Sequence, residues 1–203
     1  MNFEQLDYQL FQIINHLGMT VSFLNPLMRF LAQQAEYGFY LGVVVYWFTR
    51  RELNRKMVAQ ALISACMGLL VSGLLGHFFY RDRPFVAHSV LQLINHPANA
   101  SFPSDHAIGA FVIATSIWLF RRRDGILWLA LALCIAFSRI WTGVHYPSDV
   151  MAGAMIGMVT AVGIHQFFNH SKGLQKVLRS SIGVYEKIEA KFWPRTQQRF
   201  NEL

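Results

Sequence analysis

Residues 57–79, which read MVAQALISACMGLLVSGLLGHFF, decide the fold class of this chain. Gln60 and His77 carry the only strongly polar side chains in the stretch. A helix needs about 20 mostly apolar residues to cross the hydrocarbon core of a bilayer, so this stretch is long enough to span one. Its length and composition predict a membrane protein rather than a water-soluble domain.

Four further apolar segments accompany this one along the chain. They run over residues 27–48, 107–120, 126–141 and 150–168. The earliest carries Arg29, Gln34 and Glu36 in its first half, so we expect its outer end to lie at the membrane interface or against protein. For Glu36 the sequence leaves open a place beside a lipid entry or an ion pair with Arg29. The five segments predict an all-α integral membrane protein, a helical bundle of about five transmembrane helices.

The ends of the chain differ from this bundle. Apolar residues from Leu6 to Leu17 follow helical spacing and Asn25-Pro26 ends the pattern, which favours an amphipathic surface helix over a sixth span. No Lys or Arg precedes Arg29, so this segment is not expected to be a secretory signal. We therefore expect an amphipathic or interfacial segment over 1–25, a transmembrane domain over 26–170 and a basic cytoplasmic tail over 171–203.

Hydrophobic residues make up 54% of the chain and charged residues only 14%, yet its formal net charge is +7. Nucleic-acid binding is the usual interpretation of such a surplus. Fourteen of the 18 Lys and Arg residues, however, fall on one side of the five-span arrangement: Arg50, Arg51, Arg55, Lys56, Arg121, Arg122, Arg123, Lys172, Lys176, Arg179, Lys187, Lys191, Arg195 and Arg199. The positive-inside rule makes that side cytoplasmic, so we expect membrane lipid and no nucleic acid as a partner.

We expect residues 80–103 and 142–148 to lie on the opposite side of the membrane. The unusual polar residues that these segments hold or flank are Arg81, Arg83, Ser104, Asp105, His106, Arg139, His145 and Asp149. An ionisable residue at the end of a membrane helix is unfavourable unless it has a partner or a function. Because several converge from three helix ends, they predict a site on this face.

The residue types at this face suit phosphate chemistry. Arg83 and Arg139 provide planar, permanently charged groups that match phosphoryl oxygens. Ser104 precedes an apolar helix, so it is a candidate N-cap whose neighbouring backbone N–H groups bind anions. His145 and Asp149 are four residues apart, a spacing that lets a carboxylate orient an imidazole nucleophile. A second imidazole, His106, is then available as a general acid, and the set suits phosphoryl transfer through a phosphohistidine.

Three motifs carry a resemblance to a known family. They read Arg83-Pro84, Pro103-Ser104-Asp105-His106, and Ser138-Arg139 followed at the required offsets by His145 and Asp149. In order, spacing and placement at helix ends they resemble the signature of the type 2 phosphatidic acid phosphatase (PAP2) superfamily, over about residues 57–168. The resemblance implies a helical PAP2/haloperoxidase-like core. It also implies that His145 is the nucleophile, oriented by Asp149, with His106 as general acid and Arg83, Arg139 and the amides near Ser104 binding the phosphate.

Within the superfamily, the residues in and around the three motifs are similar to those of the bacitracin-resistance type of bacterial undecaprenyl-diphosphatase. This implies removal of the terminal phosphate of undecaprenyl diphosphate, which returns the carrier lipid undecaprenyl phosphate to cell-wall synthesis. It further implies a multi-pass protein of the bacterial cytoplasmic membrane with its active site on the periplasmic or extracellular side. An isoprenoid lipid diphosphate is the expected substrate, and we expect no metal, no other cofactor and no obligate protein partner.

Two positions depart from the superfamily pattern. The first motif of the superfamily begins with a Lys seven residues before the Arg, and Gly76 stands there in this chain. Arg81 is the tentative replacement for that charge at the substrate. Asp105 stands where the superfamily has Gly, and a carboxylate beside a phosphate is unfavourable, so we expect it to point away or to pair with Arg81 or Arg139.

Other functions remain open from the sequence. The motifs do not separate the diphosphatase from a phosphatidylglycerophosphate or phosphatidic acid phosphatase of the same superfamily. A membrane transporter is the non-enzyme alternative, and it predicts polar residues near the middle of spans rather than at one end. The spacings of His77, His88 and His96 match no usual zinc site.

Overall fold

The computed structural model describes residues 2–193, and its described residues form helices and loops without a strand. The helical elements are α1 (Phe3–Thr20), the 3-10 turn η1 (Ser22–Leu24), α2 (Asn25–Gln33), α3 (Ala35–Phe48), α4 (Glu52–Phe78), α5 (Pro84–Ala87), α6 (Asp105–Phe120), α7 (Arg122–Trp141), α8 (Pro147–His170) and α9 (Lys172–Phe192). The chain divides into two compact units after His165. The expectation of an all-α protein is therefore confirmed.

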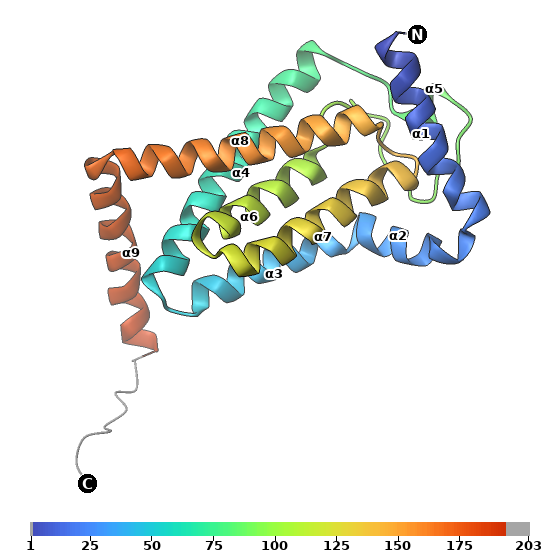
Figure 1. Ribbon diagram of the computed structural model, residues 1–203. Coiled ribbons are helices and arrows are strands. Elements are labelled where there is room, and N and C mark those ends of the chain that lie inside the picture. The colour runs from blue at the N-terminus through green and yellow to red at the C-terminus, as the bar shows by residue number, and fades with distance from the viewer. Residues whose placement is uncertain (1, 194–203) are drawn as a thin grey trace. The chain divides into compact units, whose positions relative to one another are not determined.

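Helix α6 is the core of the first unit. It lies between α4 and α7 (Figure 1), and it contacts both along its length. Ala107, Ile108, Val112 and Ala114 are fully buried on it. Since a buried helix must be apolar on most of its faces, the 16 residues of α6 show no polar stripe.

Two glycines bring α8 against α6. A Cβ on Gly153 would lie 2.6 Å from the backbone oxygen of Ser104, and one on Gly157 would lie 2.7 Å from that of Ile108. Small residues four apart let two helix backbones approach closely in membrane proteins. This contact fixes the start of α8 beside the start of α6, which are the two helix ends that carry the second and third motifs.

Within residues 2–193, three helices are long and apolar enough to cross a membrane, namely α4, α7 and α8, and α6 is a shorter apolar helix. The expected continuous span over 27–48 is wrong, because the chain breaks into α2 and α3 at Gln34. The 14 residues of α3 extend over about 21 Å, against roughly 30 Å for a hydrocarbon core. At the break, the carbonyl of Ala32 accepts a hydrogen bond from Nη1 of Arg139 at 2.7 Å.

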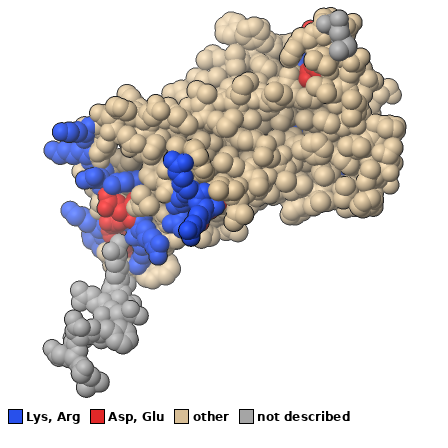
Figure 2. Space-filling view, viewed as in Figure 1, with Lys and Arg blue, Asp and Glu red and all other residues tan. Residues whose placement is uncertain are grey.

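The outer surface of the bundle is apolar. Large side chains exposed on its helices include Leu62, Leu70, Leu74, Leu127, Leu133, Met151 and Val159. Figure 2 shows an uncharged surface along the length of these helices. Monomeric soluble proteins rarely expose apolar surface on this scale, so lipid rather than water is the solvent that fits it.

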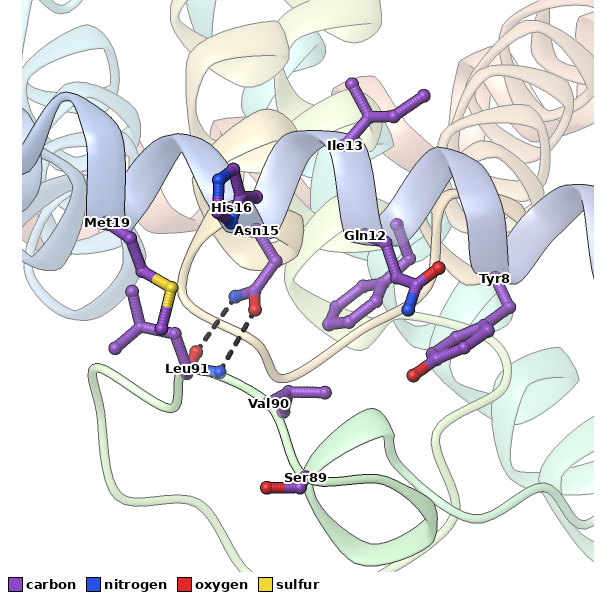
Figure 3. A pocket seen from close by; sticks show the side chains of 10 residues that line it. Tyr8, Gln12, Ile13, Asn15, His16, Met19, Ser89, Val90 and Leu91 are labelled. Carbon is purple, nitrogen blue, oxygen red and sulfur yellow. Dashed lines mark hydrogen bonds between the residues drawn. The ribbon is translucent and has the colours of Figure 1, made fainter.

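Helix α1 is tied to the bundle by a buried polar side chain. Asn15 donates to the carbonyl oxygen of Leu91 at 2.8 Å, and its own side-chain oxygen accepts from the Leu91 N–H at 3.1 Å (Figure 3). It also donates to the carbonyl oxygen of Trp141 at 2.9 Å. The hollow in that view, about 560 Å³, lies between α1 and residues 89–91 and is lined by none of the predicted site residues. Helix α1, which makes up most of the expected N-terminal segment, thus packs on protein on one side. Its location at the membrane surface stays a prediction.

The second unit contains the end of α8 and helix α9. Ser171 caps α9, since its hydroxyl accepts from the Leu174 N–H at 3.3 Å. Helix α9 forms most of the basic tail expected over 171–203, and its place on the cytoplasmic side stays a prediction. Arg195 and Arg199 of that tail lie outside the described residues.

Candidate active site

The loop before His145 depends on a glycine. Gly143 has a positive φ of 82°, and a Cβ there would lie 2.4 Å from the backbone oxygen of Leu91. Glycine is the residue that adopts this conformation without steric penalty. The turn carries the chain from the end of α7 to the start of α8, so that His145 enters the bundle and is only 2% exposed.

Asp149 lies behind His145 and is held by several donors. Its Oδ2 accepts from the Ser101 hydroxyl at 2.6 Å and from the Tyr146 N–H at 2.8 Å, and its Oδ1 accepts from Nη1 of Arg81 at 3.2 Å. The distance from its Oδ2 to Nδ1 of His145 is 3.6 Å, which is an ion-pair distance and too long for a hydrogen bond. The carboxylate is fully buried and already fixed, so a small rotation of the imidazole completes the pair.

The opposite nitrogen of His145 faces Arg83. Nη1 of Arg83 lies 3.0 Å from Nε2 of His145 and also donates to the carbonyl of Val144 at 2.9 Å. Because the guanidinium is a permanent donor, Nε2 is the unprotonated nitrogen and Nδ1–H faces Asp149. Burial lowers the pKa of His145 to about 4; the nearby Asp149 carboxylate opposes this shift, and Arg139 and Arg83 reinforce it. The imidazole is therefore neutral at neutral pH, which is the form that a nucleophile requires.

Arg83 is itself fixed by the loop that follows it. Its Nε donates to Oδ1 of Asn99 at 3.1 Å, and its Nη2 donates to the carbonyl of Ala100 at 3.1 Å. Its position at the start of α5 follows from Pro84, which fits the first turn of a helix.

Arg139 presents unused donors to the same region. It is 1% exposed, and its Nη1 donates to the Ala32 carbonyl. Its Nε and Nη2 have no hydrogen-bond partner among residues 2–193. A buried donor without an acceptor is costly, by about 1 to 3 kcal/mol each and more for a charged group. These atoms suit the oxygens of a bound anion.

The second motif forms the N-terminus of α6. Ser104 is buried and caps the helix, accepting from the Ala107 N–H at 3.5 Å, while its own N–H donates to the Asp149 carbonyl at 3.0 Å. Asp105 accepts a hydrogen bond from the Ser72 hydroxyl on α4. Of the two arrangements expected for Asp105, the structure has the one in which it points away from the arginines. It does not pair with Arg81 or Arg139.

Arg81 occupies a different place from the one expected. Its Nη2 lies 2.8 Å from Oδ2 of Asp7, its Nη1 donates to the Ser148 hydroxyl at 2.8 Å as well as to Asp149, and its guanidinium lies 3.6 Å from the centre of the Tyr146 ring. It therefore lies behind Asp149 rather than beside His145. These partners engage much of its charge, and its replacement of the substrate-binding Lys stays a prediction.

Gly76 has a packing explanation. A Cβ at this position would lie 3.3 Å from the backbone oxygen of Phe102. Glycine lets the loop that carries the second motif pass close to the end of α4. A lysine here would need that loop to move outward.

Two acidic residues near the site differ from the sequence-based expectation: Glu36 has another partner, and Asp7 is not among the predicted site residues. Glu36 lies 3.4 Å from Nε2 of His106 through its Oε2, so its partner is His106 rather than Arg29. Asp7 of α1 is buried and accepts from the Ser148 N–H at 2.9 Å and the Ser148 hydroxyl at 2.5 Å. The available signal for Asp7 was its place four residues before Phe11 and eight before Asn15, on the one face of α1 that is buried.

We expect Asp7→Ala to lower the free energy of unfolding in detergent by about 2 to 3 kcal/mol. The change leaves the buried Ser148 N–H and part of the Arg81 charge without an acceptor. Thermal or denaturant unfolding of the purified protein measures it. Glu4→Ala, which removes an exposed carboxylate of the same helix, is the control and should change stability by under about 0.5 kcal/mol. Equal effects of the two substitutions would contradict the structural role of Asp7.

Comparison with known proteins agrees with this geometry. Residues 57–172 match the PAP2 superfamily. The chain belongs to that superfamily. Over 195 residues, 96% of this chain and 94% of the relative, it is 40% identical to the "bacitracin transport permease protein BcrC" of Bacillus licheniformis. It is 34% identical to the "undecaprenyl-diphosphatase BcrC" of Bacillus subtilis, over 96% of this chain and all of that one.

A solved structure has the same PAP2 architecture. The crystal structure of Aquifex aeolicus LpxE matches with a TM-score of 0.68 and 25% identity, over 79% of this chain and 95% of that one. A Bacillus subtilis transmembrane PAP2-type phosphatidylglycerolphosphate phosphatase matches with a TM-score of 0.51 and 23% identity, which bears on the fold alone. With its long apolar helices, the chain is a multi-pass PAP2 membrane protein.

Proposed function

We propose that this protein is an undecaprenyl-diphosphate phosphatase that releases the terminal phosphate and returns undecaprenyl phosphate for cell-wall synthesis. The observation that carries the proposal is a neutral, buried His145 between a fixed Asp149 and Arg83, with the unpaired donors of Arg139 nearby. The relative from Bacillus subtilis, similar over nearly the whole chain, supports the choice of substrate. Resistance to bacitracin is the expected consequence, in keeping with the name of the Bacillus licheniformis relative.

The residues suggest a two-step displacement at phosphorus. Nε2 of His145 attacks the terminal phosphorus, and the bond to the bridging oxygen breaks as the P–N bond forms. Asp149 stabilises the developing imidazolium, while Arg83 and Arg139 bind the equatorial oxygens, where preorganised donors contribute most. Nη1 of Arg83 lies 3.0 Å from the attacking Nε2 of His145, so it is close enough to donate to an oxygen of the phosphate under attack.

His106 acts as acid and then as base. It donates a proton to the departing lipid phosphate, and afterwards takes one from the water that cleaves the phosphohistidine, which returns His145 to its neutral form and yields phosphate. Charge at the transition state is balanced by the guanidinium groups and by the N-terminus of α6. The atoms balance with one water consumed per turnover.

We place the site on the outer side of the bacterial cytoplasmic membrane. Arg50 and Arg51 lie in the connection between α3 and α4, Arg121 joins α6 to α7, and Arg122 and Arg123 begin α7; this end of the bundle is opposite the connection between α7 and α8 that holds His145. Positive charge marks the cytoplasmic side of short loops. A phosphate group arriving from the outer leaflet then reaches the arginines without crossing the bilayer.

The experiment is phosphate release by the purified protein from undecaprenyl diphosphate, phosphatidylglycerophosphate and phosphatidic acid, each with and without EDTA. We expect the highest kcat/KM with undecaprenyl diphosphate and no effect of EDTA, because protein groups supply the positive charge. Preference for a phosphatidyl lipid would show that the protein is instead a phosphatidylglycerophosphate or phosphatidic acid phosphatase. Loss of activity in EDTA would overturn the metal-free mechanism.

A transporter is the second function to test, because the Bacillus licheniformis relative is named as a bacitracin transport permease. The charged groups of the site support catalysis instead, since they gather at one end of the bundle around His145. Proteoliposomes containing the protein should hydrolyse the lipid without moving labelled bacitracin across the bilayer. Bacitracin transport by protein that releases no phosphate would favour the permease.

A further inference from the structure

Beside the site, a small cavity opens between α3, α4 and α6. It measures about 190 Å³, and Glu36, Tyr40 and His106 form part of its wall. Glu36 and His106 meet there at 3.4 Å, and the Tyr40 hydroxyl donates to the same Oε2 of Glu36 at 3.5 Å. Both members of the pair are about one quarter exposed, so the contact is partly shielded from solvent.

The charges around His106 are otherwise mostly positive. Arg139 approaches it from α7, and Arg83, His96 and His145 approach it from the loops. On its own helix, Asp105 is engaged by Ser72 of α4. Glu36, from α3, therefore supplies the carboxylate in direct contact with the imidazole.

A general acid needs a proton on the nitrogen that faces the leaving group. Among two arginines, a protonated imidazole is strongly disfavoured unless an anion lies close to it. We propose that Glu36 is a positioning residue that fixes the ring of His106 and stabilises its protonated form for proton donation to the departing lipid phosphate. This inference rests on the proposed function.

The break between α2 and α3 is what brings Glu36 to this point. The chain interrupts its helix at Gln34, and Glu36 follows in the first turn of α3. Arg139, which holds the Ala32 carbonyl at the break, is also one of the proposed phosphate ligands. The break therefore positions two groups of the site at once: Glu36, which contacts the general acid, and Arg139, which is proposed to bind phosphate.

Glu36→Gln tests the inference, because it keeps the size of the side chain and removes its charge. We expect kcat for undecaprenyl diphosphate to fall roughly 10-fold to 100-fold, a part of what general acid catalysis contributes, with KM nearly unchanged. The alkaline limb of the kcat profile should move to lower pH by about one unit, because the proton is held less tightly. In a His106→Gln background, Glu36→Gln should cause no further loss, since the two residues act as one unit.

Controls separate this from a loss of structure. Glu52→Gln makes the same change at the other end of the bundle, where Glu52 pairs with Lys56 at 2.5 Å, and should leave the profile unchanged. Glu36→Asp keeps the charge at a greater distance and should shift the limb less, which gives a second measurement if the Gln variant does not fold. An unshifted limb in both variants, or losses that add to those of His106→Gln, would overturn the inference.

The proposed function fails separately from this inference. Wild-type protein that does not release phosphate from undecaprenyl diphosphate contradicts the function itself. Wild-type protein that is active, with Glu36 variants of unchanged pH profile, contradicts only the role of Glu36.

Discussion

We expect His145→Ala to lower phosphate release from undecaprenyl diphosphate by on the order of a thousandfold or more, as removal of a nucleophile does in other covalent mechanisms. A thousandfold loss corresponds to about 4 kcal/mol of transition-state stabilisation. Without the imidazole no nucleophile is held beside the terminal phosphorus, so the covalent step is lost and only direct attack by water remains. Initial rates of phosphate release at saturating lipid measure the loss.

The variant must also be shown to fold. His145 contacts Arg83 at 3.0 Å, so its removal leaves a small cavity beside a guanidinium that still bonds to Val144, Asn99 and Ala100. These remaining bonds should keep the loop in place, and the protein should elute as the wild type does. His88→Ala is the control: His88 is exposed and stacks on Tyr8 at 4.0 Å between ring centres, outside the proposed mechanism. Wild-type rates in His145→Ala would remove the phosphohistidine mechanism.

The sequence could predict the elements whose signal is local. Apolar runs predicted spans over 57–79 and 150–168, and α4 (Glu52–Phe78) and α8 (Pro147–His170) cover them with extra turns at their ends. Length and hydrophobicity decide these helices, since every backbone polar group in lipid must be bonded within the segment. The spacing from His145 to Asp149 likewise predicts their approach, because four residues make about one helical turn.

The sequence could not predict contacts between distant segments. Asp7 and Ser148 are separated by 141 residues, and Arg139 bonds to a carbonyl 107 residues away. Such pairs leave no periodic pattern, so Arg81 was assigned to the substrate although Asp7 holds it behind Asp149. The break at Gln34 was missed for the same reason, because the groups that stabilise it come from α7.

Arg139→Lys is the second substitution with a large expected effect. Lysine keeps the positive charge but offers a single ammonium in place of a planar set of donors. In this structure Nη1 of Arg139 is occupied by the Ala32 carbonyl, while Nε and Nη2 are buried and unpaired among the described residues. An ammonium that took over the Ala32 carbonyl would leave the equatorial oxygens without their donors. We expect kcat/KM to fall about 100-fold to 1000-fold, the range for loss of a preorganised transition-state donor.

Orthovanadate distinguishes lost phosphate binding from general damage, because it imitates the five-coordinate phosphorus of the transition state. Inhibition by vanadate should weaken in Arg139→Lys in parallel with kcat/KM, since the same two nitrogens hold both ligands. Arg29→Lys makes the matched change at an exposed arginine of α2 and should leave both quantities unaltered. If Arg139→Lys lost activity while vanadate still inhibited at the wild-type concentration, Arg139 would be stabilising the α2–α3 break alone, and its unpaired nitrogens would not be the anion site.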